Sequence, residues 1–150
     1  MAKLLSLFIL AINLVYATQA NVVANEKAGC GLNRRYTAHI KVDVNNLRFR
    51  CQSKDNDLGD VVRNAGEEFN IRFCLNLFKT TLFFCHFHLG SKQRTFDVFS
   101  LKNGGDPDYC FMSEHESKDD CFWLVKEDGF YAPLRNFPGP NDWVKRFDWE

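Results

Sequence analysis

Apolar and polar residues alternate with a period of two along most of this chain, and a helical period is hard to find. The clearest alternating segments are 36–44, 47–52, 69–76 and 82–89. Further strands are expected from Phe96 onward and over 121–126 and 129–132, the last two as a hairpin around Asp128-Gly129. Because each strand needs a second sheet to cover its apolar face, the pattern predicts an all-β fold: a disulfide-stapled antiparallel β-sandwich of about seven short strands.

Turn residues and two unusual segments organise the rest of the chain. A tight turn at Asn45-Asn46 is expected to join the first two strands. Residues 102–120 form a long charged loop, and residues 136–150 form a tail that opens with Pro and Gly residues. The tail carries Trp143, Phe147 and Trp149, and the pattern leaves open whether they dock onto the sandwich or form an exposed contact.

The first 20 residues have the pattern of a secretory signal peptide. Lys3 precedes an apolar run, and small residues follow, with cleavage expected after Ala20 or, as second choice, after Ala17. The run is too short to span a membrane, and no other stretch approaches the roughly 20 apolar residues that a span needs. We expect a secreted, extracellular protein without membrane insertion. Its parts are a signal peptide (1–20), an N-terminal arm (21–35), a sandwich domain (36–135) and the aromatic tail (136–150).

The charge balance limits the classes of partner. The chain has 19 Lys and Arg residues against 19 Asp and Glu residues. A net charge near zero provides no basic surface for nucleic acid or for an anionic membrane. We therefore expect neither partner, and a monomer.

Six cysteines in a secreted chain of this size indicate disulfides before metal ligands or nucleophiles. They allow 15 connectivities, and sequence alone does not choose among them. The strand faces favour Cys51 with Cys85, since both point to the apolar side of their strands. Cys110 and Cys121 bracket part of the charged loop and are placed to staple its base. Cys74 lies on a polar face, where Cys30 of the arm is the remaining candidate to reach it.

The cysteines also stand in a distinctive set of motifs. These are Arg50-Cys51-x-Ser53-Lys54-Asp55-x-Asp57-Leu58-Gly59, Thr81-Leu82-Phe83-x-Cys85, Phe96-Asp97-Val98, Cys121-x-Trp123 and Asp128-Gly129. In order and spacing, from about residue 36 to 132, they resemble the plant self-incompatibility S1 family of small secreted S-proteins and S-protein homologues. The resemblance implies a compact β-sandwich with disulfides and a secreted signalling role; the best-known members are stigma-borne ligands of a pollen membrane receptor. Cys30 and Cys74 are additional to the four cysteines of that family.

The acidic block 55–60 superficially resembles a calcium loop. An EF-hand begun at Asp55 needs an acidic twelfth residue, and that position is Gly66. We interpret the block as an Asx-rich turn, with Leu58 facing inwards and Gly59 permitting the chain reversal.

Three histidines are the other candidate metal ligands. His86 and His88 share one strand face, and His39 becomes a third ligand only if its strand is a neighbour. The simpler interpretation is two half-exposed imidazoles on a sheet surface, so we expect no metal and no cofactor.

Catalytic residues are not expected. Cys85 and His86 are adjacent in sequence, but in a strand they point to opposite faces, and a disulfide would remove the thiolate. The chain also lacks a serine elbow, a phosphate loop and a zinc-protease helix motif. The paired acids of the chain are interpreted as solvated loop charges.

These observations favour a secreted, non-enzymatic signalling ligand that presents loops to a membrane receptor on a target cell, as in pollen–pistil recognition. Loops on rigid scaffolds commonly carry binding function, and the charged loop between Asn103 and Asp120 is the candidate. The contact residues we expect there are Asp106, Asp108, Glu114, His115, Glu116 and Lys118.

Two other classes of function remain open at this point. One is a binding module for a small ligand or cell-wall glycan, which would use Trp143, Trp149 or an exposed aromatic face. The other is a small hydrolase or metalloenzyme built on the three histidines, His39, His86 and His88.

Overall fold

β-branched and aromatic residues recur at alternate positions in most segments of the chain, and these segments form strands. The computed structural model describes residues 30–31, 33–76, 80–101, 109–112, 118–136 and 138–150. The expected signal peptide, 1–20, and most of the expected arm, 21–35, lie outside these ranges. The described residues contain ten strands and no helix, so they include no helix that is long and apolar enough to cross a membrane.

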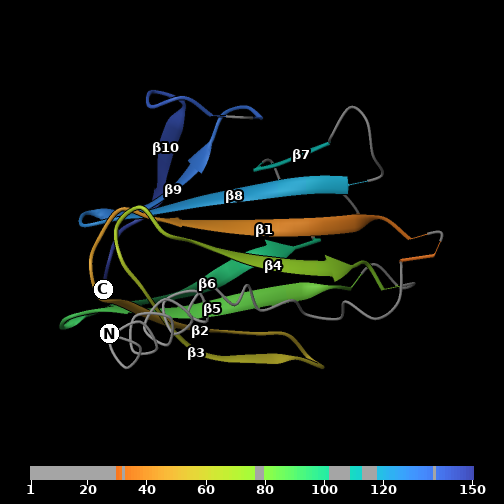
Figure 1. The fold of residues 1–150 in the computed structure, drawn as a ribbon, viewed down its shortest axis with the longest axis horizontal. Helices are drawn as coiled ribbons and strands as arrows, with labels where there is room; N and C mark the ends of the chain where they lie inside the picture. The colour runs from red at the N-terminus through yellow and green to blue at the C-terminus, as the bar shows by residue number, and fades with distance from the viewer. Residues whose placement is uncertain (1–29, 32, 77–79, 102–108, 113–117, 137) are drawn as a thin grey trace, which may run out of the picture.

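The strands form two sheets that pack face to face (Figure 1). The first sheet has the order β10-β9-β8-β1-β4, with β7 also paired to β8. Its strands are β1 (Arg35–Val42), β4 (Glu68–Cys74), β7 (Cys110–Met112), β8 (Lys118–Lys126), β9 (Gly129–Pro133) and β10 (Trp143–Phe147). The second sheet has the order β3-β2-β5-β6. Its strands are β2 (Leu47–Gln52), β3 (Asp57–Arg63), β5 (Leu82–Leu89) and β6 (Lys92–Ser100).

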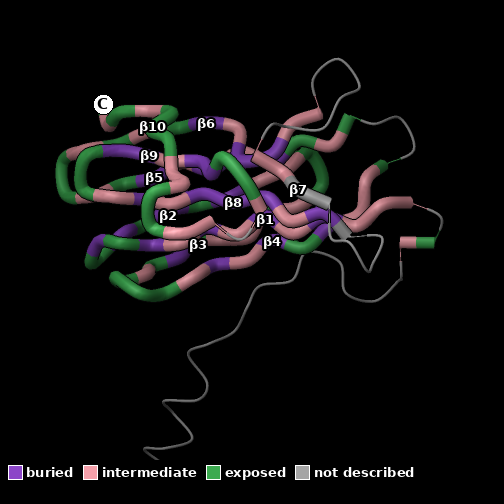
Figure 2. The backbone as a smooth tube through the Cα atoms, turned by 90° about the horizontal axis from the view of Figure 1, so that it is seen from above, coloured by how far each residue is buried: buried purple, intermediate pink, exposed green. Residues whose placement is uncertain are grey.

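Aromatic residues from both sheets fill the space between the layers. The ring centroid of Phe87, on the second sheet, lies 5.3 Å from that of Phe49 on the same sheet. It lies 5.1 Å from the ring centroid of Phe130, which belongs to the first sheet. Trp123 is buried, and its indole N–H donates a 2.9 Å hydrogen bond to the carbonyl oxygen of Val98. Buried and less buried residues alternate along the central strands (Figure 2), as the period of two predicts. The predicted all-β sandwich is confirmed.

The expected count of about seven strands was too low, because the described residues form ten. The three strands missed are β3, β7 and β10. β3 begins inside the acidic block, where the sequence has no apolar alternation to detect. β10 lies at the edge of its sheet and has mostly exposed side chains, so it also lacks a core-facing stripe. β7 is only three residues long.

Two details of the strand arrangement differ from expectation. β1 and β8 run parallel, with Ala38 opposite Cys121, so the first sheet is mixed and not wholly antiparallel. The turn at Asn45-Asn46 does not close a hairpin, because it carries the chain from β1 in the first sheet to β2 in the second. Alternation specifies which face a residue takes, and it contains no information on strand direction or on the sheet that a strand joins.

Three disulfides hold this arrangement: Cys30–Cys74, Cys51–Cys85 and Cys110–Cys121. They confirm the pair favoured by the strand faces, Cys51–Cys85, the staple expected at the base of the charged loop, Cys110–Cys121, and the remaining candidate pair, Cys30–Cys74. Cys51 and Cys85 are directly opposed on β2 and β5, and Cys110 and Cys121 are directly opposed on β7 and β8. The latter two bridges therefore each join neighbouring strands of one sheet, and the described cysteines include no free thiol.

The C-terminal segment is part of the sandwich. β10 pairs with β9, and beyond it the indole N–H of Trp149 donates to the carbonyl oxygen of Lys126 at 3.0 Å. Glu150 then exchanges two backbone hydrogen bonds with Gln93 of β6, so the tail joins the edges of both sheets. A Cβ at Gly129 would lie 2.3 Å from the carbonyl oxygen of Phe147, so this close approach of the tail requires glycine. The fold thus shows no boundary at residue 136.

Candidate binding surface on the second sheet

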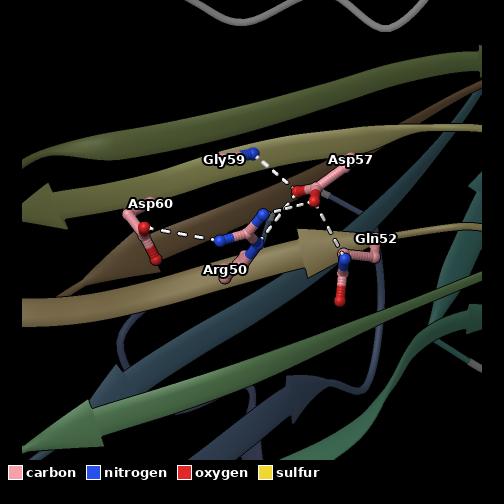
Figure 3. A network of polar contacts seen from close by, with 5 residues as sticks. All are labelled: Arg50, Gln52, Asp57, Gly59 and Asp60. Carbon is pink, nitrogen blue, oxygen red and sulfur yellow. Dashed lines mark hydrogen bonds and ion pairs between the residues drawn. The ribbon is translucent and has the colours of Figure 1, made fainter.

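The acidic block between β2 and β3 is organised around Asp57 (Figure 3). The Arg50 guanidinium pairs with both oxygens of this carboxylate, its Nε donating to Oδ1 at 3.0 Å. Gln52 donates a further 3.0 Å hydrogen bond to Oδ2, and the backbone N–H of Gly59 donates to Oδ1 at 3.0 Å. The Arg50 hydrogen bonds and the Gly59 N–H lower the pKa of Asp57 to about 2. The carboxylate therefore stays charged in all but strong acid.

The turn agrees with the Asx interpretation in most respects. Asp57 bonds to a backbone N–H two residues on, and Leu58 packs against the core. Gly59 differs from expectation: it has a positive φ of 74°, but it lies within β3 and not in the turn. The chain reverses earlier, where the N–H of Ser53 donates to the carbonyl oxygen of Asn56 at 2.7 Å. The polar network of this motif therefore has a structural role, fixing β2 against β3.

A groove of about 660 Å³ lies beside this network, on the outer face of the second sheet. β2, β3 and β5 supply most of its wall. The lining residues are Asn46, Arg48, Phe49, Arg50, Asp60, Val61, Val62, His86, His88 and Gly90. Its volume is within the usual range for sites that bind small molecules.

Basic residues of β2 and β5 are paired across this groove by strand register. Arg48 is directly opposite His88, and Arg50 is directly opposite His86. The two imidazole rings also lie against each other, with centroids 4.1 Å apart. Four basic side chains thus form a compact block on one sheet face, which places positive charge in the groove.

The acids near this block neutralise the positive charge of its arginines only in part. Arg50 is paired with Asp57 and lies 3.5 Å from the Asp60 carboxylate, measured from its NH1 to Oδ2. Arg48 makes no ion pair within the described part of the chain. Beside Arg48 in the register is Val62, whose side chain remains half exposed although it is apolar.

His39 is not a neighbour of the other two histidines, so the three-histidine metal site expected as one alternative does not form. His39 lies on β1 in the first sheet, while His86 and His88 lie on β5 in the second. No group of three or more His, Cys, Asp or Glu residues in the described ranges is placed to hold a metal ion.

His39 instead sits between two acids on the outer face of the first sheet. Its Nδ1 lies 2.6 Å from Glu68 and its Nε2 lies 2.9 Å from Asp120, while its ring stacks on Phe122 at 4.7 Å. Burial lowers the pKa of His39, but the hydrogen bonds and charges of Glu68 and Asp120 outweigh burial and raise it overall. The same contact with His39 lowers the pKa of Glu68.

The residues expected to contact a receptor lie mostly outside the described ranges. This is true of Asp106, Asp108, Glu114, His115 and Glu116. Lys118 begins β8, where its backbone is opposite Arg35. The described flank of the loop is the β7–β8 pair, joined by the Cys110–Cys121 bridge.

The tail tryptophans are placed differently from each other. Trp149 packs its ring against Phe130 at 4.4 Å and donates its indole N–H to the backbone, so it belongs to the fold. Trp143 is half buried on β10, opposite Pro133. The glycan-binding alternative therefore loses one of its two tryptophan platforms.

Comparison with known families agrees with the motifs and the sandwich. The sequence model described as plant self-incompatibility protein S1 matches residues 35–149, which include every described strand. This chain belongs to the plant self-incompatibility protein S1 family. The S1-family match extends through β10 and Trp149, in agreement with the docked tail.

Relatives of this S1-family protein include S-protein homolog 5 of Arabidopsis thaliana, 37% identical over 83 residues that cover 55% of this chain and 57% of the relative. S-protein homolog 2 of Arabidopsis thaliana is 33% identical over 117 residues, which cover 75% of this chain and 64% of the relative. Self-incompatibility protein S1 of Papaver rhoeas is 29% identical over 86 residues, which cover 57% of this chain and 57% of the relative. The match spans about three-fifths of the length of these relatives. No solved structure matches this chain.

The groove residues were missed by reasoning from the S1-family sequence. Alternation alone puts Arg48 and Arg50 on the polar face of their strand and puts His86 and His88 together on one face of theirs. The missing information was that β2 and β5 are adjacent in antiparallel register, which sets Arg48 beside His88. The Cys51–Cys85 pair was the available signal, because a bridge between these residues puts their neighbours side by side as well.

Proposed function

We propose that this S1-family protein is a secreted, non-enzymatic signalling ligand that binds a receptor protein on the surface of a target cell. The observation that carries the proposal is the family match over residues 35–149, together with the similarity to the self-incompatibility protein S1 of Papaver rhoeas. Recognition between pollen and pistil is the context that this similarity suggests.

The fold supports this proposal through the attachment of the charged loop. The Cys110–Cys121 bridge joins β7 to β8, and β8 in turn lies between β1 and β9. A loop with restrained ends loses less conformational entropy on binding, which improves the affinity available from its contacts. We therefore place the receptor contacts on Asp106, Asp108, Glu114, His115, Glu116 and Lys118.

A cell-binding assay tests the proposal. Fluorescent mature protein with intact disulfides is titrated onto candidate target cells, and we expect saturable binding that protease treatment of the cells abolishes. Changing the four loop acids Asp106, Asp108, Glu114 and Glu116 to their amides should weaken binding by roughly tenfold or more if they meet a basic receptor surface.

A matched variant controls for net charge and for folding. It changes four exposed acids outside the loop to amides, namely Asp43, Asp55, Glu127 and Asp148. Binding of this control should stay close to that of the unmodified protein, with the same far-UV circular dichroism. Equal binding by the loop variant and the unmodified protein would contradict the assignment of the loop.

A further inference from the structure

On the second sheet, two arginines of β2 stand directly opposite two histidines of β5. Like charges at directly opposed positions of neighbouring strands destabilise a sheet. Arg48 with His88 and Arg50 with His86 are two such pairs whenever the imidazoles are protonated, and the two histidines lie against each other as well. A bound anion would remove this repulsion.

The acids that face the block leave room for such an anion. Asp57 and Asp60 both lie on the Arg50 side, and Asp57 is committed to Arg50, Gln52 and Gly59. On the other side of β5, the residues of β6 opposite His86 and His88 are the uncharged Thr95 and Gln93, and the acid of that face, Asp97, is opposite Phe84, beyond His86 and away from His88. The uncompensated charge therefore lies around Arg48 and His88.

The shape and composition of the groove indicate the kind of anion. Half of the Val62 side chain is exposed beside Arg48, so an apolar contact adjoins the cationic one. β3, which carries Val62, is the edge strand of the second sheet, so an extended chain can approach it from the side. Adjacent carboxylate and apolar groups are what a polypeptide offers; a sugar acid has no aliphatic side chain to place on Val62.

We propose that this groove binds an acidic segment of a partner polypeptide. A glutamate or aspartate carboxylate of the partner lies against Arg48 and the two imidazoles, and an apolar neighbour covers Val62. This inference rests on the proposed function only in taking the partner to be a protein, and it adds a second contact surface, separate from the charged loop.

Titration with a defined peptide tests the groove without the receptor. The probe is capped hexaglutamate, added to the full mature protein labelled with ¹⁵N, and the readout is the change in amide chemical shifts. We expect the shifts to concentrate at Arg48, Val62, His86 and His88. Added salt should weaken the binding.

Variants distinguish the groove from a general charge effect. Arg48→Gln should weaken hexaglutamate binding by roughly tenfold, because it removes a charge-assisted hydrogen bond, and Arg48→Lys should retain part of the affinity. Arg135→Gln is the matched control, since it makes the same change at an exposed arginine after β9 that pairs with Asp142. Binding of the control should be unchanged.

Three results would overturn the inference. They are the absence of shifts in the groove, an equal loss of affinity in Arg48→Gln and Arg135→Gln, and groove binding by hexagalacturonate that is as tight as that of hexaglutamate. A failure here is distinguishable from a failure of the proposed function, because the peptide titration needs no receptor and the loop variants leave Arg48 in place.

Discussion

The two outer faces of this sandwich place histidine in opposite electrostatic surroundings. On the first sheet, His39 lies within 2.9 Å of both Glu68 and Asp120, so its positive charge is matched by acids. On the second sheet, His86 and His88 are opposite arginines and lie 4.1 Å from each other. The same residue type is thus paired with acids on one face and with arginines on the other.

The cause of this difference is strand order. His39 is on a central strand, with β4 on one side and β8 on the other, and each neighbour contributes an acid. His86 and His88 lie between β2, which sets arginines directly opposite them, and β6, where the directly opposed residues are the uncharged Thr95 and Gln93. A histidine that is satisfied by the fold is structural, whereas one surrounded by cations is suited to meeting an anion from outside.

The largest effect is expected from removing the disulfide adjacent to each face. Cys51–Cys85 is one residue from the Arg50–His86 pair, and Cys110–Cys121 is one residue from Asp120. With sequence separations of 34 and 11, replacing each pair by alanine should cost about 4 and about 3 kcal/mol of unfolding free energy.

Urea unfolding monitored by tryptophan fluorescence measures both costs. The Cys51/Cys85 variant should also lose hexaglutamate binding, while the Cys110/Cys121 variant should retain it. A larger cost for the Cys110–Cys121 bridge would show that loop closure does not control these energies.

The next largest effect concerns pH and His39. Because the pKa of His39 is raised above 6.5, its acid contacts stabilise the fold fully below pH 6.5, and this contribution is lost as pH rises through the folded-state pKa. The pKa of Glu68 is lowered from 4.5, so its share is lost only as pH falls through the lowered value. His39→Gln should cost about 1–2 kcal/mol near pH 6 and less at higher pH.

Unfolding free energies measured between pH 5 and 9 check this expectation. His88→Gln is the matched control from the other face, and it should not reduce stability near pH 6, since His88 faces Arg48. Equal pH dependence in His39→Gln and the unmodified protein would refute the assignment.

A smaller effect is expected from giving the second sheet the acid that it lacks. His88→Glu places a carboxylate directly opposite Arg48, and an opposite-charge pair across strands contributes roughly 0.2–1 kcal/mol. The variant should therefore be slightly more stable to urea while losing affinity for hexaglutamate. Unchanged peptide binding would show that Arg48 and His88 do not share one site.

The smallest effect on stability is expected at the exposed Arg50–Asp57 contact, where the readout is titration. Arg50→Gln should raise the pKa of Asp57 from about 2 towards its ordinary value of 3.8, because the guanidinium no longer stabilises the carboxylate. Carboxyl ¹³C shifts followed between pH 1 and 6 measure the change. Arg48→Gln should leave the titration of Asp57 unchanged. This result would separate Arg50, which is paired with Asp57, from Arg48, which is not.

Much of the fold could be predicted because period-two alternation is a local property. It identified the core-facing residues of β1, β2, β4 and β5 and aimed Cys51 and Cys85 at the same side. It failed at β3 and β10, where exposed edge positions have no apolar stripe to detect. The Asx turn was recognisable because the block is rich in Asp and Asn, whose side chains bond to nearby backbone N–H groups.

The surroundings of the histidines depended on contacts between distant strands, which no local pattern contains. Glu68 is 29 residues from His39 in sequence and Asp120 is 81 residues away, yet both lie against the same ring. The three-histidine alternative required the strand of His39 to be a neighbour of the strand of His86 and His88, and strand order, which the sequence does not specify, excludes it.

The sequence by itself determined the β class, the inward faces of β1, β2, β4 and β5, and the family, and it favoured the Cys51–Cys85 pair. Only the tertiary structure decided the parallel pairing of β1 with β8, the docking of the tail and the two contrasting histidine environments. The physical reason is that side-chain alternation follows from backbone geometry within a strand. Strand order and direction follow instead from how distant segments together cover one apolar core.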